Sequence, residues 1–328
     1  MHEANGAVDG MNRRVGIIGA GPMGMSLGAV LGQHANVVMV ERDPVRAEHI
    51  RTDGAVVHGL GHQAARVKVV SSIAELGAFG ALDAVFVATK TTAIDAVGHE
   101  LRAVMASIGE PWVVSFQNGI ASGEALRARL GTNRVARMVL NYGARLRDDG
   151  DVEVVQSSPP HVIGGPNEGS DAVSRDLAAL MSAGGMETRA VADIEPDVWL
   201  KGIMNAGMNP VAALVNMRIG EVLDSPAVRI VERLVDEGLA VAAGEGIELG
   251  GDARKRVWAV YENGRAHLPS MVEDIRAGRS SEVGQLNRQV IEHGQRVGVE
   301  TPTHALVTGL IDTFDWRVFH AGDVVRAG

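Results

Sequence analysis

The sequence of 328 residues contains no cysteine. This absence excludes disulfide bonds, thiolate nucleophiles, cysteine-ligated zinc and iron–sulfur clusters. It is compatible with a reducing compartment, so we expect a cytoplasmic protein, and we predict no metal site. Basic residues are also scarce, since 31 Lys and Arg against 40 Asp and Glu give a net charge of -9, and no basic tract is present. The charge balance therefore argues against a nucleic-acid partner.

A run without Lys, Arg, Asp or Glu extends over residues 15–40 and is long enough to span a bilayer. It contains several glycines together with Pro22, and these residues do not suit a lipid-facing helix. The segment before it is polar, carries Glu3 and Asp9, and lacks the charged-then-apolar order of a secretory leader. We therefore expect no membrane association, and we interpret residues 1–13 as a disordered extension.

The length favours two domains. In the first half, short apolar runs of strand type alternate with segments of helical length, which indicates a parallel sheet covered by helices; these runs are 15–18, 37–40, 67–70, 84–88 and 113–116, with further ones at 135–140, 152–155 and 161–163. From about residue 193 the sequence predicts helices instead, at 199–215, 227–244, 253–261 and 282–297. We predict an α/β protein with an N-terminal Rossmann-type parallel-sheet domain at 14–190 and an all-helical domain at 191–328.

A glycine-rich turn follows the first predicted strand. Its sequence, Gly19-Ala20-Gly21-Pro22-Met23-Gly24, matches G-x-G-x-x-G between a buried strand and a helix. In this motif the first glycine permits the tight turn, the second lets the backbone approach a pyrophosphate, and the third allows close helix–strand packing. The helix N-terminus adds free N–H groups for the anion. The turn therefore predicts a dinucleotide site formed by Gly19, Gly21, Pro22, Met23 and Gly24.

An acidic residue, Glu41, ends the second predicted strand. Its carboxylate can accept hydrogen bonds from both hydroxyls of an adenosine ribose and would repel a 2'-phosphate, which favours NADH over NADPH. Arg42 follows at once and could pair with such a phosphate, so NAD(P)H is the broader expectation. Arg42 could also stack on the adenine or remain a solvated surface residue.

A polar stripe lies on the predicted helix at 199–215. Lys201, Asn205 and Asn209 stand at i, i+4 and i+8 and therefore share one face, whereas the other positions are mostly apolar. An amine and two amides aligned in this way predict the wall of a substrate site. The alternative is a lysine that reaches the surface and two asparagines that bond to neighbouring backbone. Gly207 and Pro210 predict a kink beside the stripe.

This stripe, together with Pro210, resembles that of ketopantoate reductases. Three further segments carry the same resemblance: Lys90 in Val87-Ala88-Thr89-Lys90, Gln117-Asn118-Gly119, and Ser280-Ser281-Glu282 leading to Asn287. It extends from residue 15 to about residue 310. The resemblance implies that Lys201 is the general acid, that Glu282 is a second essential polar group at the substrate, and that Lys90 lies near the nicotinamide. It also implies a homodimer, and it assigns the orientation of a 2-keto acid to Asn118, Asn205, Asn209 and Ser270, with Asn118 also contacting the cofactor.

The chemistry of such a reduction requires the same groups. Hydride transfer to a keto carbon leaves negative charge on the carbonyl oxygen, which a protonated amine can stabilise and protonate. The sequence also departs from the family, with Ala212 where a threonine is common and with the acidic Glu41. We therefore expect reduction of a small 2-keto acid, with ketopantoate to pantoate as the first candidate reaction. The alternatives are an NAD-dependent D-2-hydroxyacid dehydrogenase of the same family and a non-catalytic NAD-binding sensor.

Overall fold

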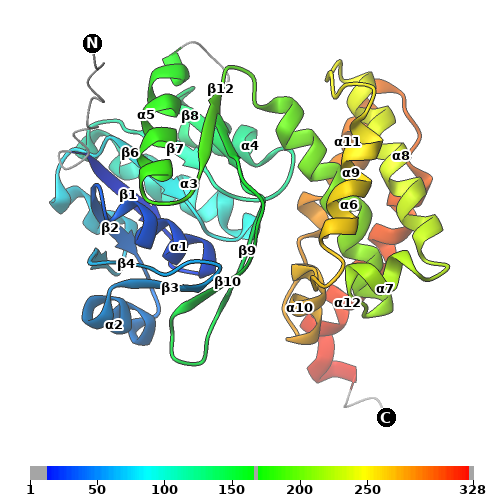
Figure 1. The fold of residues 1–328 in the computed structure, drawn as a ribbon, viewed down its shortest axis with the longest axis horizontal. Helices are drawn as coiled ribbons and strands as arrows, with labels where there is room; N and C mark the ends of the chain where they lie inside the picture. Colours follow the sequence, from blue (N-terminus) through cyan, green and yellow to red (C-terminus); the bar gives the residue numbers. More distant parts are fainter. Residues whose placement is uncertain (1–12, 166–168, 325–328) are drawn as a thin grey trace, which may run out of the picture. The chain divides into compact units, whose positions relative to one another are not determined.

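The computed structural model describes residues 13–165 and 169–324, and it confirms an α/β protein with a helical C-terminal region (Figure 1). The chain divides into two compact units. The first comprises the described residues up to Gln117 together with Ser122–Ile194. The second comprises Asn118–Ala121 and the described residues from Glu195 onward. The expected disordered extension lies outside the described residues except for Arg13, which forms ion pairs with Asp83 and Asp176.

Two sheets form the frame of the first unit. The main sheet has the strand order β12-β11-β8-β7-β6-β1-β2-β5, and its neighbours are parallel except for β8 and β11. Its strands are β1 (Arg14–Ile18), β2 (Asn36–Val40), β5 (Lys68–Val70), β6 (Ala84–Val87), β7 (Trp112–Ser115), β8 (Val135–Val139), β11 (His161–Gly164) and β12 (Thr188–Val191). The smaller sheet has the order β4-β3-β10-β9, formed by β3 (Ala55–Gly59), β4 (Gln63–Ala65), β9 (Tyr142–Leu146) and β10 (Val152–Ser157).

Both faces of the main sheet are buried. Successive side chains of a strand point to opposite faces, so Ile17 joins one hydrophobic cluster and Ile18 joins another. The first cluster includes residues of α1 (Pro22–Leu31) and α5 (Gly169–Ala183), and the second includes residues of α3 (Ile94–Val104) and α4 (Ser122–Leu130). Helix α1 also contacts β3 and β4. This burial on both sides explains why the parallel strands are continuous apolar runs.

The described part of the second unit is helical. Helix α6 packs against α8, α10 and α12. The helices are α6 (Glu195–Val215), α7 (Ile219–Leu223), α8 (Val228–Gly244), α9 (Ala253–Asn263), α10 (Ser270–Arg276), α11 (Asn287–Val297) and α12 (Pro302–Val324). The helix that we predicted at 282–297 begins only at Asn287, after a short 3-10 helix at Val283–Gln285. Leu286 separates the two because its backbone leaves the helical region, with φ -113° and ψ -86°.

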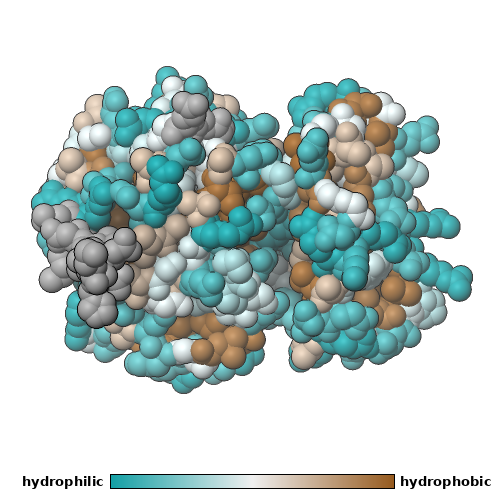
Figure 2. Space-filling model, turned by 45° about the horizontal axis from the view of Figure 1, so that its top comes forward, coloured by the Kyte–Doolittle hydropathy of each residue, from teal (hydrophilic) through white to brown (hydrophobic). Residues whose placement is uncertain are grey.

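The remaining elements of the first unit connect its strands. Within the described residues they are α2 (Pro44–Asp53) and three 3-10 helices at Ile73–Phe79, Thr91–Ala93 and Met105–Ile108. On the face drawn in Figure 2, hydrophilic side chains dominate and hydrophobic ones form separate patches. None of the helices in the described ranges combines the length and the apolar character needed to cross a membrane.

Candidate active site

Several segments singled out in the sequence follow the carboxyl ends of neighbouring strands, along one edge of the main sheet. The residues directly after β1, β2, β6 and β7 extend the sheet's hydrogen bonding there: Gly19 N donates to Val40 O at 3.1 Å, Glu41 N to Val70 O at 3.0 Å, Ala88 N to Ile18 O at 2.9 Å, and Phe116 N to Val87 O at 3.1 Å. The strand order reverses at β1, whose neighbours are β2 and β6. In open α/β sheets, ligands bind outside the carboxyl ends of the strands at such a reversal. The glycine turn, Glu41 and Lys90 all follow strands that end at this edge.

The three motif glycines have three different local environments. Gly19 has φ +97°, and a Cβ there would lie 2.8 Å from the Thr89 methyl group. A Cβ on Gly24 would overlap the carbonyl oxygen of Gly19, so the helix and the turn approach too closely for any side chain. A Cβ on Gly21 would meet nothing within 4 Å. The glycine at this position therefore leaves open space beside the backbone, which is where the motif places a pyrophosphate.

The N-terminus of α1 suits an anion. Gly21 is its N-cap and makes no side-chain cap bond to the first turn, and the first turn carries no acidic residue. Pro22 starts the helix, as prolines often do. A helix N-terminus that lacks a capping side chain offers its N–H groups and positive dipole end to a phosphate. Together with the space beside Gly21, these features fit a dinucleotide.

Glu41 and Arg42 have separate partners at the end of β2. Glu41 is 8% exposed, and its side chain accepts a hydrogen bond from Asp43 N at 2.7 Å and forms an ion pair with Arg46 of α2 at 3.2 Å. A carboxylate offers about four acceptor positions, so Glu41 retains capacity for ribose hydroxyls. Arg42 instead donates to both carboxylate oxygens of Glu100 on α3, at 2.6 and 2.7 Å. The sequence did not indicate Arg46 or Glu100, because each meets its partner only in the fold.

Lys90 and Gln117 lie close together after β6 and β7. Lys90 is exposed, and its carbonyl accepts a hydrogen bond from Gln117 Nε2 at 3.1 Å. The same nitrogen lies 3.2 Å from Thr89 Oγ1. Gln117 is buried and therefore fixes the turn that carries Lys90. The sequence indicated Gln117 only as part of a motif, although its position directly after a predicted buried strand is a signal for such a contact.

Asn118 is exposed and begins the segment Asn118–Ala121, which belongs to the second unit. Gly119 in this segment has φ +95°, and a Cβ there would lie 2.6 Å from the carbonyl oxygen of Gln285. Ile120 packs against Gly202 of α6. Asn118 is thus connected directly to a segment that is held against the helical core.

The predicted polar stripe lies along α6. Lys201, Asn205 and Asn209 are each half-buried, whereas most of the residues between them are buried, including Ile203, Ala206 and Met208. The three side chains therefore share the accessible face of a helix whose other faces form the core. The stripe is about 12 Å long at a rise of about 1.5 Å per residue. An ammonium group and two amides along this length can hold a small anionic substrate with several oxygen atoms.

Two buried side chains hold α6 from behind. The Tyr261 hydroxyl donates to Met204 O at 2.7 Å, and burial raises the pKa of Tyr261 far above its ordinary value. Gly207 permits this approach, because a Cβ there would lie 3.0 Å from the Tyr261 hydroxyl. Asn287 Nδ2 donates to Ala206 O at 2.9 Å. Pro210 has no N–H to bond this carbonyl four residues earlier, so Asn287 replaces the missing helix bond.

The helix continues through Pro210 to Val215. Gly207 and Pro210 each have a packing role in this helix. Gly207 makes room for Tyr261, and Pro210 leaves a carbonyl for Asn287.

Glu282 and Ser270 complete the predicted residues of the second unit. Glu282 is half-buried and lies between the buried residues Ser281 and Val283. Ser281 is anchored through its N and Oγ, at 2.8 and 2.7 Å, to the carboxylate of Asp315 on α12. Asp315 therefore positions the backbone that carries Glu282, and nothing in the sequence pattern indicated it. Ser270 is exposed at the first position of α10.

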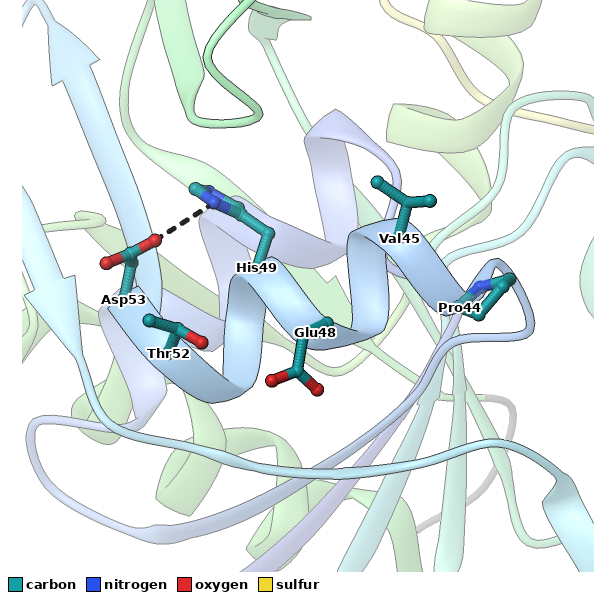
Figure 3. A pocket seen from close by; sticks show the side chains of 6 residues that line it. All are labelled: Pro44, Val45, Glu48, His49, Thr52 and Asp53. Atoms are coloured by element: carbon teal, nitrogen blue, oxygen red, sulfur yellow. Dashed lines mark ion pairs between the residues drawn. The ribbon is translucent and has the colours of Figure 1, made fainter.

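A surface hollow lies on α2 and is lined by Pro44, Val45, Glu48, His49, Thr52 and Asp53 (Figure 3). All of these residues come from one helix. His49 pairs with Asp53 at 3.1 Å and with Asp151 at 3.0 Å. This hollow brings together none of the predicted site residues. Across the described ranges, no three His, Asp or Glu side chains are grouped so that they could hold a metal ion.

The parallel sheet, the glycine turn at its reversal point and the acidic residue after β2 define a dinucleotide-dependent class of protein. Comparison with known families narrows this class. Residues 15–167 match the family described as Ketopantoate reductase PanE/ApbA, and residues 193–315 match Ketopantoate reductase PanE/ApbA C terminal. The chain belongs to the ketopantoate reductase family of NAD(P)-dependent oxidoreductases, as its motifs indicated.

Relatives and solved structures agree with this assignment. The chain is 30% identical to 2-dehydropantoate 2-reductase of Archaeoglobus fulgidus over 302 residues, which cover 91% of this chain and 97% of that protein. It is 26% identical to the enzyme of the same name from Pyrococcus horikoshii, over 91% of this chain and 96% of that protein.

Two solved structures have the same fold. A PanE/ApbA family ketopantoate reductase from Ralstonia eutropha has a TM-score of 0.83 at 23% identity and covers 94% of this chain and 100% of its own. The ternary structure of D-mandelate dehydrogenase with NADH and anilino(oxo)acetate has a TM-score of 0.81 at 21% identity and covers 93% of this chain and 99% of its own.

Proposed function

We propose that the protein reduces ketopantoate to pantoate, with NADH as the preferred hydride donor and Lys201 as the general acid. Family membership supports the reduction of a 2-keto acid with a nicotinamide cofactor. The finer proposal depends mainly on one observation, the half-buried alignment of Lys201, Asn205 and Asn209 along α6.

The stripe meets the requirements of this reduction. When bound, the reduced nicotinamide supplies a hydride to the keto carbon of the substrate. Lys201 then balances the charge that develops on the carbonyl oxygen and donates its Nζ proton to form the hydroxyl. The amides of Asn205 and Asn209 can bond a carboxylate or hydroxyl without changing the net charge beside the lysine. A non-catalytic sensor would need no such set of groups.

The other predicted residues have supporting roles in this proposal. Glu282 accepts a hydrogen bond from a substrate hydroxyl, and its negative charge favours the protonated form of a nearby lysine. Asn118 and Ser270 orient the substrate, and Lys90 lies near the nicotinamide, as the family resemblance implies. The anchoring of Ser281 by Asp315 would keep Glu282 in place.

The preference for NADH is supported by Glu41. Its carboxylate is largely buried at the end of β2 and is already fixed by Asp43 N and Arg46. A fixed carboxylate at this position accepts bonds from two ribose hydroxyls and repels a phosphate. We therefore expect Glu41→Ala to weaken NADH binding modestly and to shift the preference toward NADPH.

A second candidate is an NAD-dependent D-2-hydroxyacid dehydrogenase with another substrate. Two observations favour it: the acidic Glu41 and the fully buried Ala212, which stands on α6 where the family commonly has a threonine. An alanine here lacks both the hydroxyl and the γ-methyl group of threonine, and this loss can change which substrate fits.

Initial rates of NADH and NADPH oxidation with a panel of 2-keto acids separate these possibilities. We expect the highest kcat/KM with ketopantoate and NADH. A higher kcat/KM with an aromatic or linear 2-keto acid would favour the second candidate. If NADPH were at least about 10-fold more efficient, a difference of about 1.4 kcal/mol, our interpretation of Glu41 would be wrong. Cofactor binding without turnover of any keto acid would indicate a sensor.

A further inference from the structure

Charged side chains alternate in sign at the end of β2. Arg46 pairs with Glu41 at 3.2 Å, and Arg42 pairs with Glu100 at 2.6 Å. Arg42 and Glu41 follow the strand, Arg46 belongs to α2, and Glu100 belongs to α3. Two arginines and two carboxylates thus form two ion pairs at the position that the fold reserves for the adenosine ribose.

The Arg42–Glu100 pair determines where the Arg42 guanidinium lies. One nitrogen, Nη2, donates to both Glu100 oxygens. The two side chains are 61% and 37% exposed, so the pair adds little to the stability of the fold. The ion pair nevertheless engages Arg42, the arginine next to the expected position of the ribose. An arginine near this position is the group that accommodates a 2'-phosphate in NADP-dependent enzymes.

We propose that Glu100 is a determinant of cofactor choice that acts by engaging Arg42. A 2'-phosphate brings a charge of about -1.5 to -2. To bind it, Arg42 would have to leave Glu100, and the released carboxylate would remain close to the incoming phosphate. Glu100 therefore adds to the discrimination by Glu41, although it lies 58 residues from Arg42 in the sequence. This inference rests on the proposed use of a nicotinamide dinucleotide at this site.

The test is direct binding of NADH and NADPH to the whole protein, measured through the fluorescence of the cofactor. Glu100→Gln preserves the size of the side chain and removes its charge. We expect the Kd for NADPH to decrease by roughly 3- to 10-fold, while the Kd for NADH changes by less than about 2-fold. The additional change Arg42→Ala should abolish the gain, because the arginine would no longer be present to bind the phosphate.

Asp95→Asn is the matched control. Asp95 also lies on α3 and pairs with an arginine, Arg129, at 2.7 Å. This variant removes one negative charge from the same helix, and we expect no selective gain in NADPH binding. An equal gain in both variants would attribute the effect to net charge and overturn the proposal.

The remaining outcomes are also decisive. If wild type binds NADH and Glu100→Gln leaves NADPH binding unchanged, Glu100 has no role in cofactor choice, and the proposed function still stands. If wild type binds neither cofactor, the proposed function fails and this inference fails with it.

Discussion

Lys201 combines a charged group with a half-buried position on a largely buried helix. The amides of Asn205 and Asn209 lie along the same face. A lysine with only a structural role would contribute through packing of its methylene groups and through surface charge. The proposed general acid would contribute to the reaction itself. These two roles predict different losses when the side chain is removed.

We expect Lys201→Ala to lower kcat by about 10² to 10⁴, the usual effect of losing a positioned acid, while the Kd for NADH changes little. The change in kcat and the melting temperature should be measured on the same preparation. Lys255→Ala is the control, because Lys255 is exposed on α9 of the same unit. Unchanged turnover with a lower melting temperature would identify Lys201 as a structural residue.

At the scale of elements, the six-residue turn between β1 and α1 contains one glycine that is needed for packing and another that is needed for binding. Gly24 is required for packing, because its Cα lies against the carbonyl of Gly19. Gly21 meets no such restriction, since a Cβ there would enter open space and its φ of -69° suits any residue. The two glycines are therefore needed for different reasons.

Substitution of Gly21 and of Gly24 by alanine should separate the binding role of the first from the packing role of the second. Gly21→Ala should fold with a melting temperature near that of wild type, but it should bind NADH at least about 10-fold more weakly because the methyl group occupies the space of the pyrophosphate. Gly24→Ala should lose roughly 2 kcal/mol or more of the free energy of unfolding, because a Cβ would overlap the Gly19 carbonyl. Thermal unfolding and NADH titration measure both effects. Equal loss of stability in the two variants would contradict this division.

Helix α6 depends on a bond from outside itself. Asn287 supplies to Ala206 O the hydrogen bond that Pro210 cannot supply. We expect Asn287→Ala to cost about 1–3 kcal/mol in the free energy of unfolding, because a buried carbonyl loses its partner. In a Pro210→Ala background the helix can form its own bond, so the same change should cost about 1 kcal/mol less.

Urea unfolding of the four proteins in this cycle tests the coupling, and Gln289→Ala provides a control on the same helix. The Gln289 side chain donates a hydrogen bond to the carboxylate of Glu292, which lies on the same helix α11. Additive costs of Asn287→Ala and Pro210→Ala would mean that Asn287 does not compensate for the proline.

At the scale of the whole molecule, one buried histidine connects several helices of the second unit. His304 Nε2 donates to Leu234 O at 2.9 Å, and its Nδ1 accepts from Asn287 Nδ2 at 3.1 Å. This arrangement fits the neutral imidazole. Burial lowers the pKa of His304, against smaller opposing effects of the Leu234 carbonyl and the Glu237 carboxylate.

The stability of the protein should therefore fall in mild acid. Below an ordinary histidine pKa of about 6.5, the unfolded chain binds a proton that folded His304 does not, which favours unfolding. This contribution is fully present above that pH and decreases below it, by at most about 1.4 kcal/mol per pH unit. Urea midpoints between pH 5 and 8 measure it. His304→Gln should show a weaker pH dependence, whereas the exposed control His99→Gln should keep that of wild type.

The sequence by itself determined the class of the molecule. Strand runs buried on both faces, the glycine spacing and the acidic residue at position 41 are local features, and each depends on residues close together in the chain. The alignment of Lys201, Asn205 and Asn209 could be predicted for the same reason, because a helix repeats every 3.6 residues. The predicted start of a helix at Glu282 was wrong, because the helix begins at Asn287. Asp315 holds the backbone at Ser281, and the non-helical backbone of Leu286 interrupts the segment before Asn287.

Only the tertiary structure decided which distant residues support these groups. Glu100 reaches Arg42, Gln117 reaches the turn of Lys90, and Asn287 reaches the carbonyl left by Pro210. The partners in each contact are separated by 27 to 81 residues. No periodicity or local motif encodes such pairs, because they depend on which strand ends and helix faces the packing of the core brings together. The physical reason is that burial selects the fold as a whole, and the polar contacts of the site are formed only once that fold exists.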